Sequence, residues 1–185
     1  VRLTCGSDDV VLITRSGLSL RFNEEQARSQ GRATSGVFGI RPRNEDRVIG
    51  LALVSEEQKL LVASENGIGK RTSFDDYRQQ SRGGKGVITM KCTEKTGNVV
   101  GAAAVSDDDE LMLMTTGGQS IRIRVSDVRE TGRNAQGVKL VTLNNGEKLQ
   151  DIAPVREGTA DEESEADENS EADENSEADE GNNKD

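Results

Sequence analysis

The chain has 185 residues, of which 24 are basic and 34 acidic, with two cysteines and no histidine. Without histidine a Ser-His or Cys-His catalytic arrangement is excluded, and Cys5 and Cys92 lie too far apart for the usual zinc spacings. No apolar run approaches the roughly 20 residues that span a bilayer, and no secretory leader is visible at the start. We therefore expect a cytoplasmic protein with no catalytic or metal-binding residues, whose two thiols are reduced and buried.

A predicted β-hairpin occurs three times, each time turning on a glycine. The segments are LITRSGLSLRF, VASENGIGKRT and MTTGGQSIRIR, and their glycines, Gly17, Gly67 and Gly118, are spaced 50 and 51 residues apart. Apolar and polar residues alternate after the turn, which predicts one apolar face and one outward polar face. We expect this outward face to carry cations that contact DNA phosphates or form salt bridges to a neighbouring repeat: Arg21, Lys70, Arg71, Arg122 and Arg124.

A glycine-rich motif, here called the box, follows each hairpin at the same spacing. The boxes are GRATSGV (31–37), SRGGKGV (81–87) and GRNAQGV (132–138). Their last glycines, Gly36, Gly86 and Gly137, are predicted to allow a backbone bend or a close approach of another backbone. Arginine and lysine at loop tips suit phosphate oxygens. The candidate DNA ligands of this region are Arg32, Arg78, Arg82, Lys85 and Arg133.

Further apolar runs complete each repeat. One run follows each box directly (VFGI, VITM and VKLV), and a later one supplies another strand (VIGLALV, VVGAAAV and LQDIAPV). With about four short antiparallel strands per unit, the chain is predicted to be all-β, with propeller-like blades. The expected repeats are about 1–50, 51–101 and 102–155, and NEEQARSQ (23–30) is the one expected helical turn. Three blades do not close a ring, so either the chain is part of a longer protein, which the missing initiator Met favours, or it pairs with a second copy.

The charge is distributed unevenly along the chain. Fourteen of the acidic residues and two of the basic ones follow Val155, which leaves a net charge of +2 on residues 1–155. Repeats of SEADEN make 156–185 a low-complexity acidic segment, for which we expect a disordered tail. The tail is expected either to act as a solubilising extension or to compete electrostatically with DNA for the basic surface.

The boxes resemble a known family. YRQQSRGGKGV (77–87), GRNAQGVKLV (132–141) and ENGIGKRTSFDDY (65–77) are similar to the C-terminal domain of the A subunit of bacterial DNA gyrase, and the resemblance covers 1–155. It implies a six-bladed β-pinwheel, of which this chain would be the last three blades, and DNA wrapping that supports ATP-dependent negative supercoiling. The family's hallmark box has Arg where this chain has Ser81, and it belongs to a first blade that is not expected here.

The resemblance also implies partners and cofactors. The partners would be double-stranded DNA, a second A subunit plus a B subunit in an A2B2 enzyme located at the bacterial nucleoid, with no membrane. ATP and magnesium would belong to other domains, so this segment would carry no cofactor and no catalytic residue, and Tyr77 would be structural. Two alternatives stay open: the equivalent domain of topoisomerase IV, and a protein-binding propeller without a nucleic-acid role.

GIGKRT (67–72) is not a phosphate-binding P-loop, and SDDDE (106–110) is a turn rather than a calcium loop.

Overall fold

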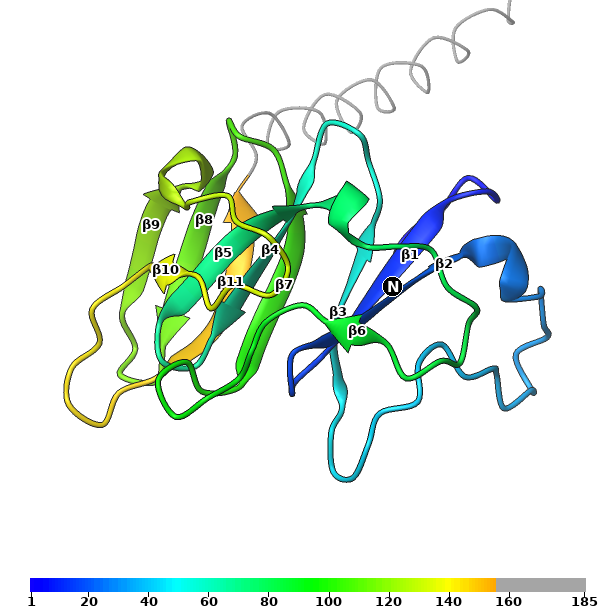
Figure 1. The fold of residues 1–185 in the computed structure, drawn as a ribbon, viewed down its shortest axis with the longest axis horizontal. Helices are drawn as coiled ribbons and strands as arrows, with labels where there is room; N and C mark the ends of the chain where they lie inside the picture. The colour runs from blue at the N-terminus through cyan, green and yellow to red at the C-terminus, as the bar shows by residue number, and fades with distance from the viewer. Residues whose placement is uncertain (156–185) are drawn as a thin grey trace, which may run out of the picture. The chain divides into compact units, whose positions relative to one another are not determined.

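A computed structural model describes residues 1–155, which form one compact unit (Figure 1). The predicted acidic tail lies outside the described residues. Within 1–155 no helix is long and apolar enough to cross a membrane. The elements in chain order are β1 (Asp9–Thr14), β2 (Leu18–Asn23), the 3-10 helix η1 (Glu24–Gln26), β3 (Val48–Leu53), β4 (Lys59–Ser64), β5 (Ile68–Ser73), η2 (Phe74–Asp76), β6 (Val87–Ile88), β7 (Val99–Val105), β8 (Glu110–Thr115), β9 (Ser120–Arg124), η3 (Val125–Asp127), β10 (Val138–Lys139) and β11 (Leu149–Val155).

The three predicted hairpins are present as β1–β2, β4–β5 and β8–β9, all antiparallel. The turn glycines have positive φ angles of 82° at Gly17, 73° at Gly67 and 81° at Gly118, a region that side chains with a Cβ avoid. A third strand, β3, β7 or β11, pairs with the first strand of each hairpin, and its register shifts near the hairpin turn in all three sheets. The repeats therefore share one local architecture.

The fourth strand of each complete sheet comes from the following repeat. Strand β6 pairs with β2, and β10 pairs with β5, so the strand orders are β3-β1-β2-β6 and β10-β5-β4-β7. This confirms the predicted all-β fold of blades with about four antiparallel strands. The third sheet, in the order β11-β8-β9, has three strands, and the run VFGI forms only an isolated bridge between Ile40 and Gly84. The expected strand is absent there because each box run pairs with the hairpin of the repeat before its own, and residues 1–155 contain no repeat before the first.

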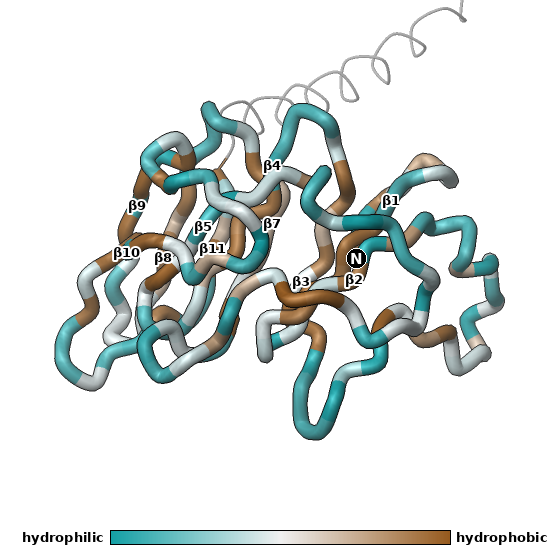
Figure 2. Tube along the Cα trace, viewed as in Figure 1, coloured by the Kyte–Doolittle hydropathy of each residue, from teal (hydrophilic) through white to brown (hydrophobic). Residues whose placement is uncertain are grey.

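Successive sheets pack against one another through their third strands. Strand β3 contacts β7, and β7 contacts β11. Small residues allow this approach: a Cβ built on Gly101 would lie 2.5 Å from Cγ1 of Ile152. The largest apolar cluster is built around Leu61, Leu111 and Leu113. Figure 2 shows the hydrophobic stretches mainly along the strands and the hydrophilic ones in most of the connections between them.

Most of the short segments between the strands agree with what the sequence predicted for them. The expected helical turn in 23–30 is η1, and η2 and η3 stand at the equivalent places. Tyr77 is buried, with its hydroxyl 2.6 Å from the Thr89 hydroxyl, as expected of a structural residue. Ser106–Glu110 leads from β7 to β8 as a turn. The expectation of buried thiols is wrong for Cys5, which is exposed because no strand covers the first eight residues, and Cys92 is only partly buried.

Candidate nucleic-acid interface

The last glycine of each box has a left-handed backbone. Its φ is 78° at Gly36, 76° at Gly86 and 96° at Gly137. A Cβ on Gly86 would lie 2.7 Å from the carbonyl oxygen of Ser19, and one on Gly137 only 2.4 Å from that of Gly69. Both neighbours belong to the hairpin of the preceding repeat, and around Gly36 nothing lies within 4 Å of that position. The glycine thus bends the box and lets it approach the preceding hairpin.

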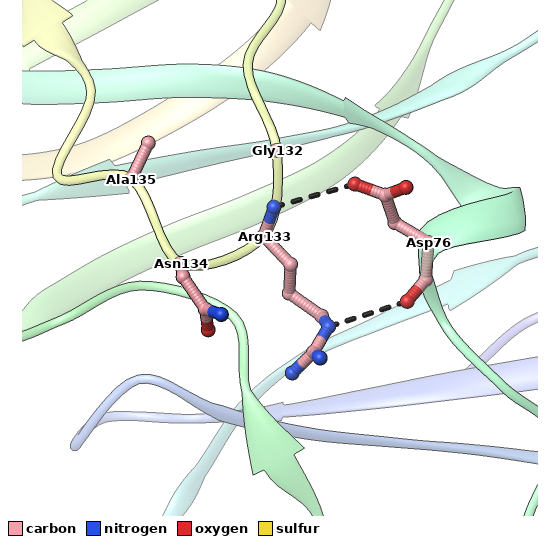
Figure 3. Close-up of a pocket in the computed structure, with 5 residues that line it drawn as sticks. All are labelled: Asp76, Gly132, Arg133, Asn134 and Ala135. Carbon is pink, nitrogen blue, oxygen red and sulfur yellow. Dashed lines mark hydrogen bonds between the residues drawn. The ribbon is translucent and has the colours of Figure 1, made fainter.

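The box arginines Arg82 and Arg133 hold successive boxes together. Arg82 donates from Nε to the carbonyl of Gln26 (2.9 Å) and from a terminal nitrogen to that of Phe38 (2.6 Å). Arg133 makes the equivalent contacts, from Nε to the carbonyl of Asp76 (3.2 Å) and from a terminal nitrogen to that of Ile88 (2.7 Å). Figure 3 shows the Arg133–Asp76 pair, including the bond from the backbone N–H of Arg133 to the Asp76 carboxylate. The structure therefore gives these two predicted DNA ligands an architectural role.

The strand arginines lock the 3-10 turn of the next repeat. Arg21 forms an ion pair with Asp9 at 2.8 Å and donates to the carbonyls of Phe74 (3.0 Å) and Tyr77 (3.4 Å). Arg71 is an ion partner of Asp107 and donates to the carbonyls of Val128 (2.6 Å) and Ser126 (3.4 Å). The predicted alternative of a salt bridge to a neighbouring repeat therefore describes Arg71, whereas Arg21 forms its ion pair within its own hairpin and reaches the next repeat through backbone carbonyls.

Lys70 lies fully buried beneath the third box. Its ammonium group donates to the carbonyls of Gly132 (2.9 Å) and Arg133 (2.6 Å). Burial, followed by the nearby Arg133 cation, lowers the pKa of Lys70 to about 8. The expected outward orientation is therefore wrong for Lys70 and Arg71, because five of the six residues of β5 are buried and both faces of the strand are covered.

Four of the ten predicted DNA ligands remain exposed, and within residues 1–155 their side chains make no hydrogen bond or ion pair. A fifth, Arg122, is exposed but pairs with Glu110. Lys85 at the tip of the second box is the most direct candidate, because its ammonium group is free to meet a phosphate oxygen. The four are Arg32, Arg78, Lys85 and Arg124.

The structure reveals a series of arginines that the sequence motifs indicated only at Arg78. Arg28, Arg78 and Arg129 each stand two residues after a 3-10 helix and are spaced 50 and 51 residues apart. All three are exposed, and none of their side chains has a hydrogen bond or ion pair within the described part of the chain. The repeat spacing itself was the signal that could have found them. An arginine kept in three repeats without an internal partner is a candidate for binding an external anion.

Other exposed cations follow the boxes. Lys139 lies on β10, and the connections after the first and second box carry cations without an ion pair in residues 1–155; Arg41 lies 5.4 Å from the ring centre of Phe38. These connections were not singled out from the sequence because they lack the repeated glycine pattern. Their cations are Arg41, Arg43, Arg47, Lys91 and Lys95.

A hollow of about 320 Å³ lies at the third box, lined by Asp76, Gly132, Arg133, Asn134 and Ala135 (Figure 3). The guanidinium of Arg133 is engaged by carbonyls, and the Asp76 carboxylate accepts the backbone N–H of the same residue. The hollow therefore offers an anion little net attraction, and the exposed arginine series is the better candidate for phosphate binding.

Comparison with known proteins identifies relatives along most of the chain. The family described as DNA gyrase C-terminal domain, beta-propeller, matches residues 8–55, 58–106 and 109–156. The A subunit of DNA gyrase from Deinococcus deserti is 48% identical over 154 residues, 80% of this chain and 19% of that protein. The same subunit of Salmonella typhimurium is 42% identical over 163 residues, 88% of this chain and 19% of that protein. The chain thus spans about a fifth of the length of these relatives.

Solved structures share the fold. The structure of a DNA gyrase A C-terminal domain aligns with a TM-score of 0.75 and 30% identity, covering 81% of this chain and 51% of that one. The crystal structure of the C-terminal domain of a DNA topoisomerase IV aligns with a TM-score of 0.83 at 22% identity, over 91% of this chain and 53% of that one, a likeness of fold alone. The three matched repeats and the identity to several A subunits show that this chain belongs to the DNA gyrase C-terminal domain family.

Proposed function

We propose that residues 1–155 bind duplex DNA through its phosphates and bend it along their outer connections, as the wrapping part of a gyrase-type topoisomerase. The observation that carries this is the series Arg28, Arg78 and Arg129, because each repeat offers one exposed guanidinium at an equivalent place with no partner among residues 1–155. Equivalent cations at regular intervals suit a polymer whose charge is also regularly spaced.

The mode of binding is independent of base sequence. The chain has only three phenylalanines and one tyrosine, and Phe38 alone of these four is exposed, so residues 1–155 offer no series of stacking platforms for successive unpaired bases. Backbone contacts to a bent duplex need only cations along a path. In the whole enzyme, this segment would act at the bacterial nucleoid with a second A subunit plus a B subunit, while other domains would supply ATP hydrolysis, magnesium and strand cleavage.

Fluorescence anisotropy of the 185-residue chain with a linear duplex, measured from low to physiological salt, tests the proposal. Binding should weaken steeply with salt, and the triple variant Arg28→Ala, Arg78→Ala, Arg129→Ala should lower the slope of log K against log salt by about 3, near one unit per lost phosphate contact. The triple Arg→Lys variant keeps the charges and serves as the matched control. If the triple alanine variant has native circular dichroism and an unchanged slope, these three arginines do not contact the phosphates.

The acidic tail allows a second test of DNA binding by the exposed cations. We propose that residues 156–185, with 14 acidic and two basic side chains, compete with DNA for the exposed cations. Removing these residues should tighten DNA binding at low salt, and the gain should shrink as salt rises. Equal affinity of the two forms at low salt would leave the tail without this role.

A further inference from the structure

An exposed apolar side chain stands at the end of strand β6, directly before a buried segment. The exposed fraction of Ile88 is 46%, whereas Thr89 and Met90, which follow it, are 0% and 1% exposed. Strand β6 pairs with β2 of the preceding repeat, and Arg133 of the following repeat binds the Ile88 carbonyl. Ile88 therefore has both neighbouring repeats beside it, and its side chain still faces the solvent.

The equivalent place in the first repeat is also apolar. Phe38 lies 50 residues before Ile88 and is 67% exposed, and Lys139 lies 51 residues after Ile88 on β10. Because β10 forms with a lysine at this place, the fold does not require an apolar side chain there. A single exposed apolar residue is ordinary on a protein surface, but one that recurs at the repeat spacing calls for a partner outside the chain.

Exposed cations surround Ile88. Arg133 donates to the carbonyls of both Asp76 and Ile88, so these two backbone segments lie within reach of one guanidinium group. Arg78, an exposed member of the arginine series, follows Asp76 by two residues, and the exposed Lys85 precedes Ile88 by three. An apolar side chain among cations fits a partner that has both an anionic backbone and apolar faces, as duplex DNA has in its phosphates and stacked bases.

The preceding junction has the same arrangement. Arg82 donates to the carbonyls of Gln26 and Phe38, and Arg28 follows Gln26 by two residues. Both junctions therefore place an apolar side chain close to an exposed arginine of the series.

We propose that Ile88 inserts between two adjacent base pairs of a bound duplex and kinks it, while Arg78 and Lys85 hold nearby phosphates. This inference rests on the DNA binding proposed above and deepens it. Proteins that bend DNA frequently insert apolar side chains between base steps and partly unstack the bases. Phe38 would act in the same way in the first repeat, whereas Lys139 would bind phosphate.

The backbone beneath Ile88 is held firmly, as a wedge requires if it is to unstack bases without yielding itself. The N–H groups of Thr89 and Met90 both donate to the carbonyl of Gly17, at 2.8 and 3.2 Å. The Ile88 carbonyl accepts from Arg133 at 2.7 Å. Arg133 would thus position the wedge in addition to joining the repeats.

A wedge responds to the stiffness of the DNA and makes no hydrogen bond to a base. Pyrimidine–purine steps such as TA unstack and kink easily, whereas A-tracts are stiff. We therefore expect a duplex with one central TA step to bind more tightly than a duplex with an A-tract in its place. The preference adds to the phosphate contacts, which do not depend on base sequence.

The fluorescence of 2-aminopurine, which stacking quenches, tests the insertion. The probe is a linear duplex with one central thymine–2-aminopurine step, and the protein is the 185-residue chain with Phe38→Lys, so that Ile88 is the one apolar residue left at this place in the three repeats. Binding should raise the fluorescence by at least about threefold. Adding Ile88→Lys, which copies the natural Lys139, should abolish the rise and leave the affinity within about threefold. Ile88→Leu keeps the apolar bulk and should keep the rise.

The preference for a flexible step supplies an independent readout. Replacing the central TA step by an A-tract should weaken binding of the Phe38→Lys chain by about fivefold, and binding of the chain that also carries Ile88→Lys by less than about twofold.

Anisotropy on the same samples separates this proposal from the one it rests on. Salt-dependent binding with the same fluorescence with and without Ile88→Lys would overturn the wedge and leave the phosphate contacts standing. A folded chain that binds no duplex at low salt would overturn both.

Discussion

Arg71 and Arg122 stand at the same place in consecutive repeats, one inside the array and one at its open end. Arg71 is buried, with donors directed to the carbonyls of Val128 and Ser126 and to the Asp107 carboxylate. The Arg122 side chain is 52% exposed, and its one ion partner within residues 1–155 is Glu110 on the adjacent strand. The difference lies in the neighbouring repeat, since only Arg71 has a further 3-10 turn beside it. A repeated cation thus takes its role from its neighbour repeat, and the boxes show the same contrast.

The largest expected effect comes from removing the arginine at the inner junction. Arg71→Ala should lower the free energy of unfolding by about 4 kcal/mol, because it leaves the carbonyls of Val128 and Ser126 without their charged donor, at about 1–3 kcal/mol each. Arg122→Ala should change it by less than about 0.5 kcal/mol, as for an exposed pair. Urea unfolding followed by circular dichroism measures both. Equal losses in the two variants would mean that the junction contacts carry no special stability.

Alanine substitutions of the box glycines test the same difference between a box that contacts a neighbouring repeat and one that does not. Gly36→Ala should cost about 1 kcal/mol for its left-handed backbone alone. Gly137→Ala should cost about 3 kcal/mol, since its Cβ would also press on the carbonyl of Gly69, 2.4 Å away. Thermal unfolding of the two variants under identical conditions compares them. If Gly36→Ala proved as damaging as Gly137→Ala, the close approach of Gly137 to the carbonyl of Gly69 would not account for the loss of stability.

The stabilising effect of Lys70 depends on pH. Leu20 occupies its place in the first repeat. The folded-state pKa of Lys70, about 8, lies below its ordinary value of 10.5, so between these values the unfolded chain binds a proton that the folded chain has lost. The contribution of Lys70 to stability therefore rises with pH in this window, by up to about 1.4 kcal/mol per pH unit.

The test for Lys70 is a comparison with Lys70→Leu across pH 8 to 10. The free energy of unfolding of the wild-type chain, relative to that of the variant, should increase as pH rises. Lys70→Arg stays charged throughout the window and serves as a control for the volume of the side chain. Parallel curves for all three chains would show that the ammonium group keeps its ordinary pKa in the folded state.

The sequence by itself determined the local architecture of this protein. Glycines at a constant spacing and alternating apolar residues specify hairpins with one buried face, since turn geometry and strand periodicity are local properties. The three hairpins, the third strands and the helical turn after β2 were all predicted in this way. The spacing of 50 and 51 residues also indicated that the units are repeats, and the boxes pointed to the gyrase family that the comparison then showed.

The tertiary structure decided which repeat receives each box strand and which cations reach the solvent. Nothing in the run VITM specifies that it completes the sheet of the preceding hairpin, because strand partners are chosen by contacts between distant segments. The run VKLV forms β10 in the same way and covers the outer edge of β5. Lys70 and Arg71 on β5, which alternation alone placed outside, are buried. Arg28, Arg78 and Arg129 remain exposed beyond the 3-10 turns. Burial is a property of neighbouring repeats, so identical motif positions separate into structural cations and free ones only in the assembled fold.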